Sequence, residues 1–332
     1  AGGPVGYGRY GNESWSALEA AISELEGGQT LSFSSGMAAI SAVFSILPIG
    51  APVVASNQGY SGTMGLLNQH HASGRLEVRF VDITNTDEVI SAMKGAALLW
   101  LESPTNPCLD IADLPALIAA AKKQTIGVGV DNTFATPLVQ KPLSMGADIV
   151  MHSSTKYFGG HSDILGGALV TAKKDAFWEK IRNVQRIGGA VPSPTDCYYL
   201  TRSIRTLAYR MKGHASNAKA LAEFLVSHGQ VEKVYYPGLA SHPNHAVAAQ
   251  QMHGFGGMVS FTVKGAAADA DRVLSKLRFF ANATSLGGVE SLIERRAAVE
   301  GPNTTTPENL LRVSVGLEHI DDLIEDMKRA LG

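Results

Sequence analysis

The fold is decided by residues 126–156, IGVGVDNTFATPLVQKPLSMGADIVMHSSTK, which hold two short apolar runs. Ile126–Val130 predicts a buried strand that ends at Asp131, and Asp148–His152 predicts a second strand that ends at Ser153. Short and continuously apolar strands are typical of a parallel sheet that is covered by helices on both faces. Ligands of such sheets bind beyond the carboxyl ends of the strands, so the polar residues that follow these runs are candidate site residues.

Outward from this stretch, the first half of the chain alternates strands of the same kind with helices. Four more strands are predicted, at Thr30–Phe33, Pro52–Ala55, Val78–Val81 and Ala97–Glu102. Helices are predicted at Trp15–Leu25, from Met37 onward and at Leu114–Lys123. This alternation predicts an α/β fold with a mostly parallel sheet and helices on both faces.

The second half of the chain has a different pattern. Asp196–His228 predicts a long helix broken only at Gly213, and four shorter elements follow: strands at Met258–Val263 and Leu311–Val315, and helices at Ala266–Leu277 and Ile320–Leu331. We therefore expect a smaller α+β domain at the C-terminus. The expected divisions are an N-terminal arm at residues 1–12, a large domain at 13–212 and the C-terminal domain at 213–332.

Composition excludes several classes of protein. The 332 residues carry 28 basic and 30 acidic side chains, so the excess of positive charge expected of a general nucleic-acid binder is absent. Two cysteines, Cys108 and Cys197, provide no disulfide framework and no cysteine-based metal site, and we expect no bound metal. The longest apolar run, Met37–Leu47, is too short to cross a bilayer, and Ala1–Pro4 shows no signal peptide. We expect a cytoplasmic protein.

Two of the predicted strand ends carry groups suited to an anion and to a covalent bond. Ser35-Gly36-Met37 stands at a helix N-terminus, where free N–H groups suit a phosphate; the simpler interpretation is a turn with a serine cap. Lys156 lies between a buried strand and Gly159-Gly160, and a lysine desolvated there forms a Schiff base readily. Its neighbours Ser153 and Thr155 are suited to donate to a phosphate, although most lysines after strands are simply solvated.

The third group is the carboxylate of Asp131, which ends an apolar strand 25 residues before Lys156. A carboxylate buried there needs a cationic partner, and a protonated pyridine nitrogen would serve; the alternative is a cap of the next turn. A phosphate cradle, a lysine that follows serine and threonine, and this aspartate together describe a site for pyridoxal phosphate.

Ordered matches along nearly the whole chain make it resemble the cystathionine γ-synthase, γ-lyase and β-lyase family of Cys/Met-metabolism enzymes. The matching segments are Tyr7–Asn12 (YGRYGN), Leu25–Gly28 (LEGG), Ser35–Ala39 (SGMAA), Glu102–Pro107 (ESPTNP), Val130–Phe134 (VDNTF), His152–Tyr157 (HSSTKY), Gly160–Asp163 (GHSD), Ser285–Ser291 (SLGGVES) and Leu311–Glu318 (LRVSVGLE). The resemblance implies a fold type I transferase that depends on pyridoxal 5'-phosphate.

The resemblance also implies a role for each matching residue. Lys156 forms the Schiff base with the cofactor and shuttles protons, and Tyr60 stacks on the ring and assists proton transfer. The remaining cofactor contacts are Asp131 at the ring nitrogen, Thr133 near the ring, and Gly36, Met37, Ser153 and Thr155 at the phosphate. Arg312, Ser285 and Asn106 bind the substrate α-carboxylate, for which the planar fork of an arginine is well suited. Tyr7 and Arg9 reach the phosphate of a neighbouring subunit in a homotetramer.

Three departures from the family pattern concern the far end of the substrate. Gly65 stands where many members have an arginine, and Thr284 stands where many have a glutamate that would meet the distal amino group of cystathionine. Residues 293–302, IERRAAVEGP, replace the usual His-Pro and Met-Thr-His strings. A distal charge would lack its partner, so we expect a substrate that is smaller or less charged there than cystathionine. Arg295 or Arg296 could restore a distal anion site, which would reverse that expectation.

The expected reaction is γ-elimination or γ-replacement on an acylhomoserine, or on a methionine-like or cystathionine-like amino acid. β-Elimination uses the same residues and remains an alternative, as does a γ-lyase for a non-sulfur amino acid. A catalytically silent binding protein is disfavoured because Lys156, Asp131, Tyr60 and Arg312 are all present. A nicotinamide-dependent dehydrogenase is disfavoured because no Gly-x-Gly-x-x-Gly follows a first strand.

Overall fold

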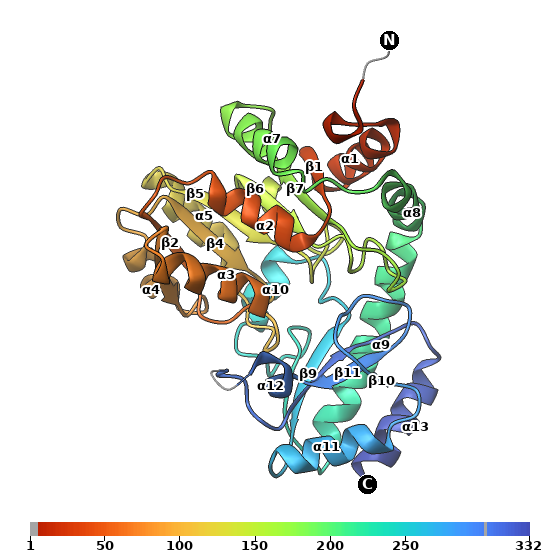
Figure 1. Cartoon of the computed structure of the whole chain (residues 1–332). Coiled ribbons are helices and arrows are strands. Elements are labelled where there is room, and N and C mark those ends of the chain that lie inside the picture. The colour runs from red at the N-terminus through yellow and green to blue at the C-terminus, as the bar shows by residue number, and fades with distance from the viewer. Residues whose placement is uncertain (1–5, 302–303) are drawn as a thin grey trace.

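The computed structural model describes residues 6–301 and 304–332, and it contains two sheets (Figure 1). The larger sheet has seven strands in the order β1-β7-β6-β5-β4-β2-β3. Their bounds are β1 (Gln29–Phe33), β2 (Ala51–Ser56), β3 (Leu76–Val81), β4 (Leu98–Glu102), β5 (Gly127–Asp131), β6 (Ile149–His152) and β7 (Gly167–Thr171). Neighbouring strands are parallel except where β7 pairs antiparallel with β1 and β6. The predicted α/β class with a mostly parallel sheet is confirmed.

Helices surround this sheet. They are η1 (Gly8–Tyr10), α1 (Glu13–Glu26), α2 (Gly36–Ser45), α3 (Ser61–Ala72), α4 (Thr86–Ala92), α5 (Leu114–Lys123), α6 (Pro142–Met145), α7 (Ala176–Gly188) and α8 (Pro194–Ile204). Helix caps define several of these boundaries. At the start of α1 the side chain of Asn12 accepts the Trp15 N–H, and at its end Gly27 adopts a left-handed conformation with a φ of 82°. Among the described residues, no helix is both long and apolar enough to cross a membrane.

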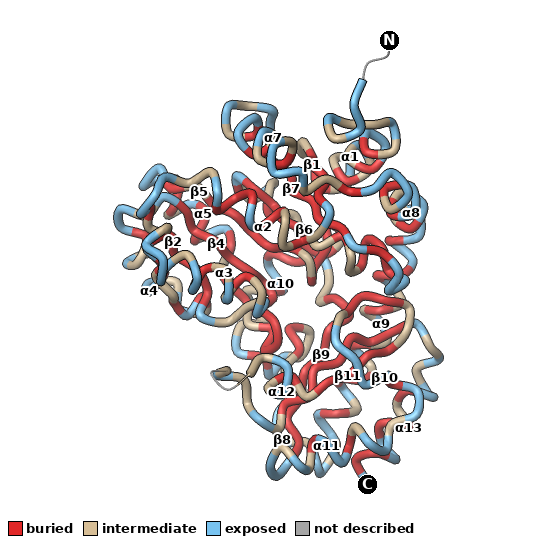
Figure 2. The backbone as a smooth tube through the Cα atoms, in the orientation of Figure 1, coloured by how far each residue is buried: buried red, intermediate tan, exposed pale blue. Residues whose placement is uncertain are grey.

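Both faces of the large sheet are buried, as the apolar strands predict. Adjacent residues of one strand point to opposite faces, so Val53 packs in the core under α2 and α7, while Val54 packs in the core under α4 and α5. Figure 2 shows the strands as a buried layer with the exposed residues on the outer sides of the helices. Helices therefore cover both faces, as expected.

The smaller sheet has five strands in the order β10-β11-β12-β9-β8. The elements of this region are α9 (Leu207–Ser227), β8 (Val231–Tyr235), α10 (His245–Gln251), β9 (Met258–Val263), α11 (Ala267–Lys276), β10 (Ala281–Asn282), β11 (Leu292–Arg295), α12 (Arg296–Glu300), β12 (Leu310–Ser314) and α13 (Ile320–Leu331). Its strands are antiparallel except for the parallel pair β10 and β11. This is the α+β region that the second half of the sequence predicts.

The prediction of one long helix broken at Gly213 was wrong. The break lies at Arg205 and Thr206, between α8 and α9, and Gly213 lies inside α9. A Cβ on Gly213 would lie 2.7 Å from Leu317 Cδ2, so this glycine permits close packing against the chain that follows β12.

Helix α9 contributes to both cores: Leu207 and Met211 join the core beside the large sheet, and Leu221 and Leu225 join that of the smaller sheet. The division at residue 213 stays a prediction. So does the N-terminal arm, of which residues 1–5 lie outside the described part of the chain.

Candidate active site

The carboxyl ends of β4, β5 and β6 lie side by side because these strands are neighbours in the parallel part of the sheet. A cavity of about 360 Å³ lies at this edge. It is lined by every predicted site residue except Tyr7 and Arg9, namely Gly36, Met37, Tyr60, Asn106, Asp131, Thr133, Ser153, Thr155, Lys156, Ser285 and Arg312. Residues from both sheets thus form one cavity.

One wall of the cavity is the N-terminus of α2. Ser35 caps this helix by accepting the Ala38 N–H at 3.1 Å. A Cβ on Gly36 would lie 3.0 Å from Ser153 Oγ, and a Cβ on Gly167 of β7 would lie 2.2 Å from the Ser35 carbonyl oxygen. The two glycines therefore allow the first turn of α2 to lie against the sheet edge, with its positive dipole end beside the cavity. This arrangement suits an anion.

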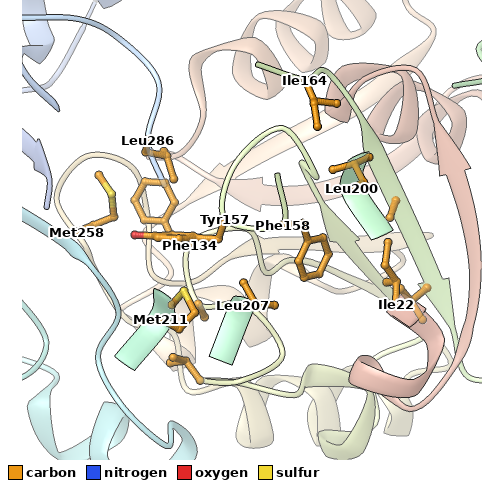
Figure 3. Close-up of a cluster of buried hydrophobic side chains, with 14 of the residues drawn as sticks. Ile22, Phe134, Tyr157, Phe158, Ile164, Leu200, Leu207, Met211, Met258 and Leu286 are labelled. Atoms are coloured by element: carbon orange, nitrogen blue, oxygen red, sulfur yellow. The ribbon is translucent and has the colours of Figure 1, made fainter. Parts of the chain in front are cut away.

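Lys156 lies in the loop after β6 and is anchored by the residues that follow it. Tyr157 and Phe158 are buried in the core beside the large sheet (Figure 3). Lys156 Nζ donates to Ser285 Oγ at 2.8 Å. Ser285 has a φ of 82°, a strained conformation for a residue with a side chain, and strain of this kind is common at functional sites.

The loop that contains Ser285 packs closely against the backbone at Lys156 and Tyr157. Gly287 has a φ of 78°, and a Cβ there would lie 2.7 Å from the backbone nitrogen of Tyr157. Gly287 N–H donates to Ser314 Oγ at 2.8 Å, which ties the same loop to β12. Contact at van der Waals distance between the two loops therefore holds the lysine amine in place.

The pKa of Lys156 is lowered to about 8, mainly by burial and also by the positive charges of Arg312 and Arg296, while Glu294 acts in the opposite direction. An amine with this pKa is partly neutral at physiological pH. It can therefore act as a nucleophile and as a proton acceptor.

Asp131 is 7% exposed at the end of β5, and its Oδ1 accepts the Thr133 N–H at 3.0 Å. Burial raises the pKa of this carboxyl, although the hydrogen bonds from Thr133 act in the opposite direction. Among the described residues, no side chain forms an ion pair with it. A buried carboxylate in this position suits a ligand that brings a cation.

Arg312 is 3% exposed and is held on three sides. Its Nη1 donates to Asn106 Oδ1 at 3.0 Å, its Nη2 donates to the Ser285 carbonyl oxygen at 2.9 Å, and it forms an ion pair with Glu294. Its pKa is lowered to about 10, mainly by burial, although Glu294 acts in the opposite direction. Its buried Nε has no partner among the described residues, so one donor of this guanidinium is unsatisfied.

Sequence reasoning quoted Glu102 within a motif but gave it no role. Its Oε2 accepts the Tyr60 N–H at 2.7 Å and its Oε1 accepts the Asn106 N–H at 2.9 Å. The pKa of Glu102 is raised to about 8, mainly by burial and also by the nearby Asp131. One carboxyl group thus fixes the backbone of two candidate site residues. The position of Glu102 at a strand end, beside Asp131, was a signal that could have identified Glu102 as a site residue.

The residues that depart from the family pattern separate in space. Thr284 and Arg296 line the main cavity, whereas Arg295 Nε pairs with Asp271 Oδ1 at 2.7 Å outside it. Gly65 lines a second cavity of about 290 Å³ that shares Ser61 and Asn106 with the first. Of the two arginines that the sequence left open, Arg296 is the one that faces the main cavity.

Tyr7 and Arg9 do not reach the cavity within one subunit. Tyr7 is 58% exposed, and Arg9 Nη1 donates to the Arg186 carbonyl oxygen at 2.5 Å. The Arg9 guanidinium also lies 5.3 Å and 5.2 Å from the ring centres of Tyr7 and Tyr10. Their predicted contact with a neighbouring subunit stays a prediction.

We expect the reactivity of Lys156 toward a small acylating reagent in the ligand-free protein to rise with pH and level off above about 8. The reason is that only the neutral amine reacts, and its neutral fraction is complete above the lowered pKa. Mass spectrometry of the peptide that contains Lys156 measures the rate, with N-acetyl-lysine amide as the control, whose rate should rise to about pH 10. Parallel profiles for the two amines would contradict the lowered pKa.

Pyridoxal 5'-phosphate fits the groups around the cavity. The phosphate suits the N-terminus of α2 with the hydroxyls of Ser153 and Thr155, and the aldehyde suits the amine of Lys156. A protonated ring nitrogen would supply Asp131 with the cation that it lacks within the described chain.

Known proteins resemble this chain over almost its whole length. Cystathionine gamma-synthase of Mycobacterium tuberculosis is 44% identical over 334 residues, covering 98% of this chain and 86% of the relative. Cystathionine beta-lyase of Lactococcus lactis is 43% identical over 335 residues, covering 98% of this chain and 88% of the relative. The crystal structure of metB from Corynebacterium glutamicum matches with a TM-score of 0.96 at 41% identity, covering 99% of this chain and 87% of that one.

The family model described as Cys/Met metabolism PLP-dependent enzyme matches residues 2–332. The match spans both sheets and all the residues that line the cavity. The expected cofactor, pyridoxal 5'-phosphate, and the fold type I architecture are confirmed by these similarities. The chain belongs to the Cys/Met metabolism family of PLP-dependent enzymes, as a member of its cystathionine synthase and lyase group that serves sulfur amino acid metabolism.

Proposed function

We propose that the chain catalyses γ-elimination or γ-replacement on a γ-substituted amino acid such as an acylated homoserine or a methionine-like thioether. The observation that carries this proposal is the position of Ser285 between two functional groups. Its Oγ accepts from Lys156 Nζ at 2.8 Å, and its carbonyl oxygen accepts from Arg312 Nη2 at 2.9 Å. An α-amino acid whose carboxylate pairs with Arg312 would therefore have its Cα close to the lysine amine.

The cofactor, when bound, supplies an electron sink for the carbanion formed at the substrate Cα. We assign its covalent attachment to Lys156 and its ring nitrogen to Asp131, with Thr133 and Tyr60 beside the ring. We assign its phosphate to the N-terminus of α2, formed with Gly36, Met37, Ser153 and Thr155. The buried carboxylate of Asp131 and the open first turn of α2 support these assignments.

Lys156 has the properties of the group that moves protons during the reaction. Its lowered pKa of about 8 leaves the amine able to take a proton from Cα, to release that proton, and only then to take a second proton from Cβ, as γ chemistry requires. Asn106 and Ser285 orient Arg312 toward the substrate carboxylate. Tyr60, 40% exposed at the cavity, is assigned a second role in proton transfer.

The distal end of the site supports a substrate without the distal ammonium group of cystathionine. Thr284 lines the cavity without a charge, and Gly65 offers no side chain to the adjoining cavity. A distal ammonium group would thus have no acidic partner from these positions, and burying an unpaired charge costs several kcal/mol. The γ-leaving group is therefore assigned as an acyl ester or a simple thioether.

We propose a homotetramer in which each active site is completed by Tyr7 and Arg9 of a neighbouring subunit. Their exposed position away from the cavity of their own subunit supports this arrangement. We also propose a cytoplasmic location, which the two free, buried cysteines Cys108 and Cys197 support.

We expect the holoenzyme to release 2-oxobutanoate, the product of γ-elimination, from O-acetylhomoserine or methionine. Pyruvate from cystathionine should form at least about tenfold more slowly, since the distal ammonium of that substrate lacks a partner. Product assays that separate the two oxo acids measure this, with Lys156→Ala as the inactive control. Pyruvate as the main product would establish β-elimination instead, and a clear preference for cystathionine would overturn the substrate assignment.

We expect that mixing Arg9→Ala and Lys156→Ala subunits, each nearly inactive alone, restores activity after subunit exchange. A mixed dimer holds one site with an intact Lys156 and an intact Arg9, so random pairing gives about a quarter of the wild-type activity. Turnover of the mixture, compared with each variant alone, measures this. Mixtures no more active than the separate variants would contradict a shared site.

A further inference from the structure

Arg296 is a buried arginine that lines the cavity, and the proposed reaction assigns it no role. It is 4% exposed, it begins α12, and it lines the same cavity as Lys156 and Arg312. Its charge is held in place by two carboxylates: Nη1 lies 3.0 Å from Glu294 Oε1, and Nε donates to Glu300 Oε1 at 2.8 Å. Among the described residues, the remaining nitrogen, Nη2, has only Ser61 Oγ as a partner, at a long 3.4 Å. A charged donor therefore remains available at the cavity wall.

The position of Arg296 relative to Arg312 is defined by Glu294. Both guanidinium groups bond the same oxygen, Oε1 of Glu294, which lies opposite Arg312 in the paired strands β11 and β12. The Nη2 atom of Arg296 also lies 3.4 Å from Ser61 Oγ, at the first residue of α3. Because Ser61 also lines the adjoining cavity with Gly65, the guanidinium of Arg296 lies next to a position at which the sequence departs from the family pattern.

The charge that this wall presents to the cavity is positive. Arg296 lines the cavity, whereas its partners Glu294 and Glu300 do not. The acidic residues that line the cavity are Glu102 and Asp131, and both are engaged elsewhere. Glu102 accepts two backbone N–H groups, and its pKa is raised to about 8, mainly by burial. Asp131, at the end of β5, accepts the Thr133 N–H.

Resting on the proposed function, we infer that Arg296 determines which charge the enzyme accepts on the distal group of the substrate. It favours a γ-substituent that ends in an anionic or hydrogen-bond-accepting group, such as an acyl carbonyl or carboxylate, and it disfavours a distal ammonium. The neutral Thr284 in the same wall leaves this preference unopposed. Glu294 and Glu300 act as positioning residues, because they fix the guanidinium and do not line the main cavity, although Glu300 lines the adjoining one.

Three unreactive amino acids of similar length provide the test: 2-aminoadipate with a distal carboxylate, norleucine with a methyl group and lysine with an ammonium. Their inhibition constants are measured against O-acetylhomoserine turnover, and a spectral titration of the holoenzyme reports the same binding without turnover. For the wild type we expect the order 2-aminoadipate, norleucine, lysine, with lysine weaker than 2-aminoadipate by about tenfold or more, as an unfavourable charge contact predicts.

Arg296→Gln removes the cation and leaves the carboxylates of Glu294 and Glu300 without this partner. The ratio of the inhibition constant of lysine to that of 2-aminoadipate should therefore fall by about tenfold or more. Glu300→Gln keeps Arg296 and its pair with Glu294 but removes one compensating charge, so the same ratio should rise. This second variant tests the inference even if Arg296→Gln fails to fold. Arg295→Gln is the matched control, because Arg295 pairs with Asp271 outside the cavity and its loss should leave the ratio unchanged.

Two results would overturn the inference. One is a wild-type enzyme that binds lysine as tightly as 2-aminoadipate. The other is a ratio that stays at the wild-type value in both Arg296→Gln and Glu300→Gln, including the case in which all three ligands weaken equally because Arg296 serves the α-carboxylate. Failure of the proposed function is distinguishable, since it would remove O-acetylhomoserine turnover while the spectral titration still orders the three ligands.

Discussion

The site depends on the close contact between the Ser285–Gly287 loop and the backbone that follows Lys156. A Cβ at Gly287 would lie 2.7 Å from the backbone nitrogen of Tyr157, so only glycine allows the loop to come this near. That approach places Ser285 Oγ at 2.8 Å from the lysine amine and the Ser285 carbonyl oxygen at 2.9 Å from Arg312. The large sheet supplies the lysine, and the smaller sheet supplies the arginine. The contact between them helps to form one cavity from residues of both sheets.

Positive charge dominates the substrate side of this cavity and has chemical consequences. Burial together with the charges of Arg312 and Arg296 lowers the pKa of Lys156 to about 8. Glu294 stabilises both arginines, because its Oε1 atom forms an ion pair with each of them. The network thus keeps two guanidinium groups charged in a buried place while leaving the lysine amine able to exchange protons.

Much of this could be predicted from the sequence because its signals are local. Asp131 and Lys156 follow apolar strands directly, and neighbouring parallel strands end at one edge of a sheet, so proximity follows from the pattern. Arg296 could not be placed in this way. Its role depends on the pairing of β11 with β12 and on a contact with Ser61, 235 residues distant in sequence. Gly213 was misjudged for a similar reason, since its importance comes from Leu317 in a later segment and not from its own helix.

The central claim is that Lys156 is the residue that binds pyridoxal phosphate covalently. Borohydride reduction of the purified holoenzyme, followed by proteolysis and mass spectrometry, tests it most directly. The account predicts one phosphopyridoxyl adduct, on the peptide that contains Lys156, and none in the Lys156→Ala variant. An unmodified Lys156 peptide, or an adduct on another lysine, would contradict it.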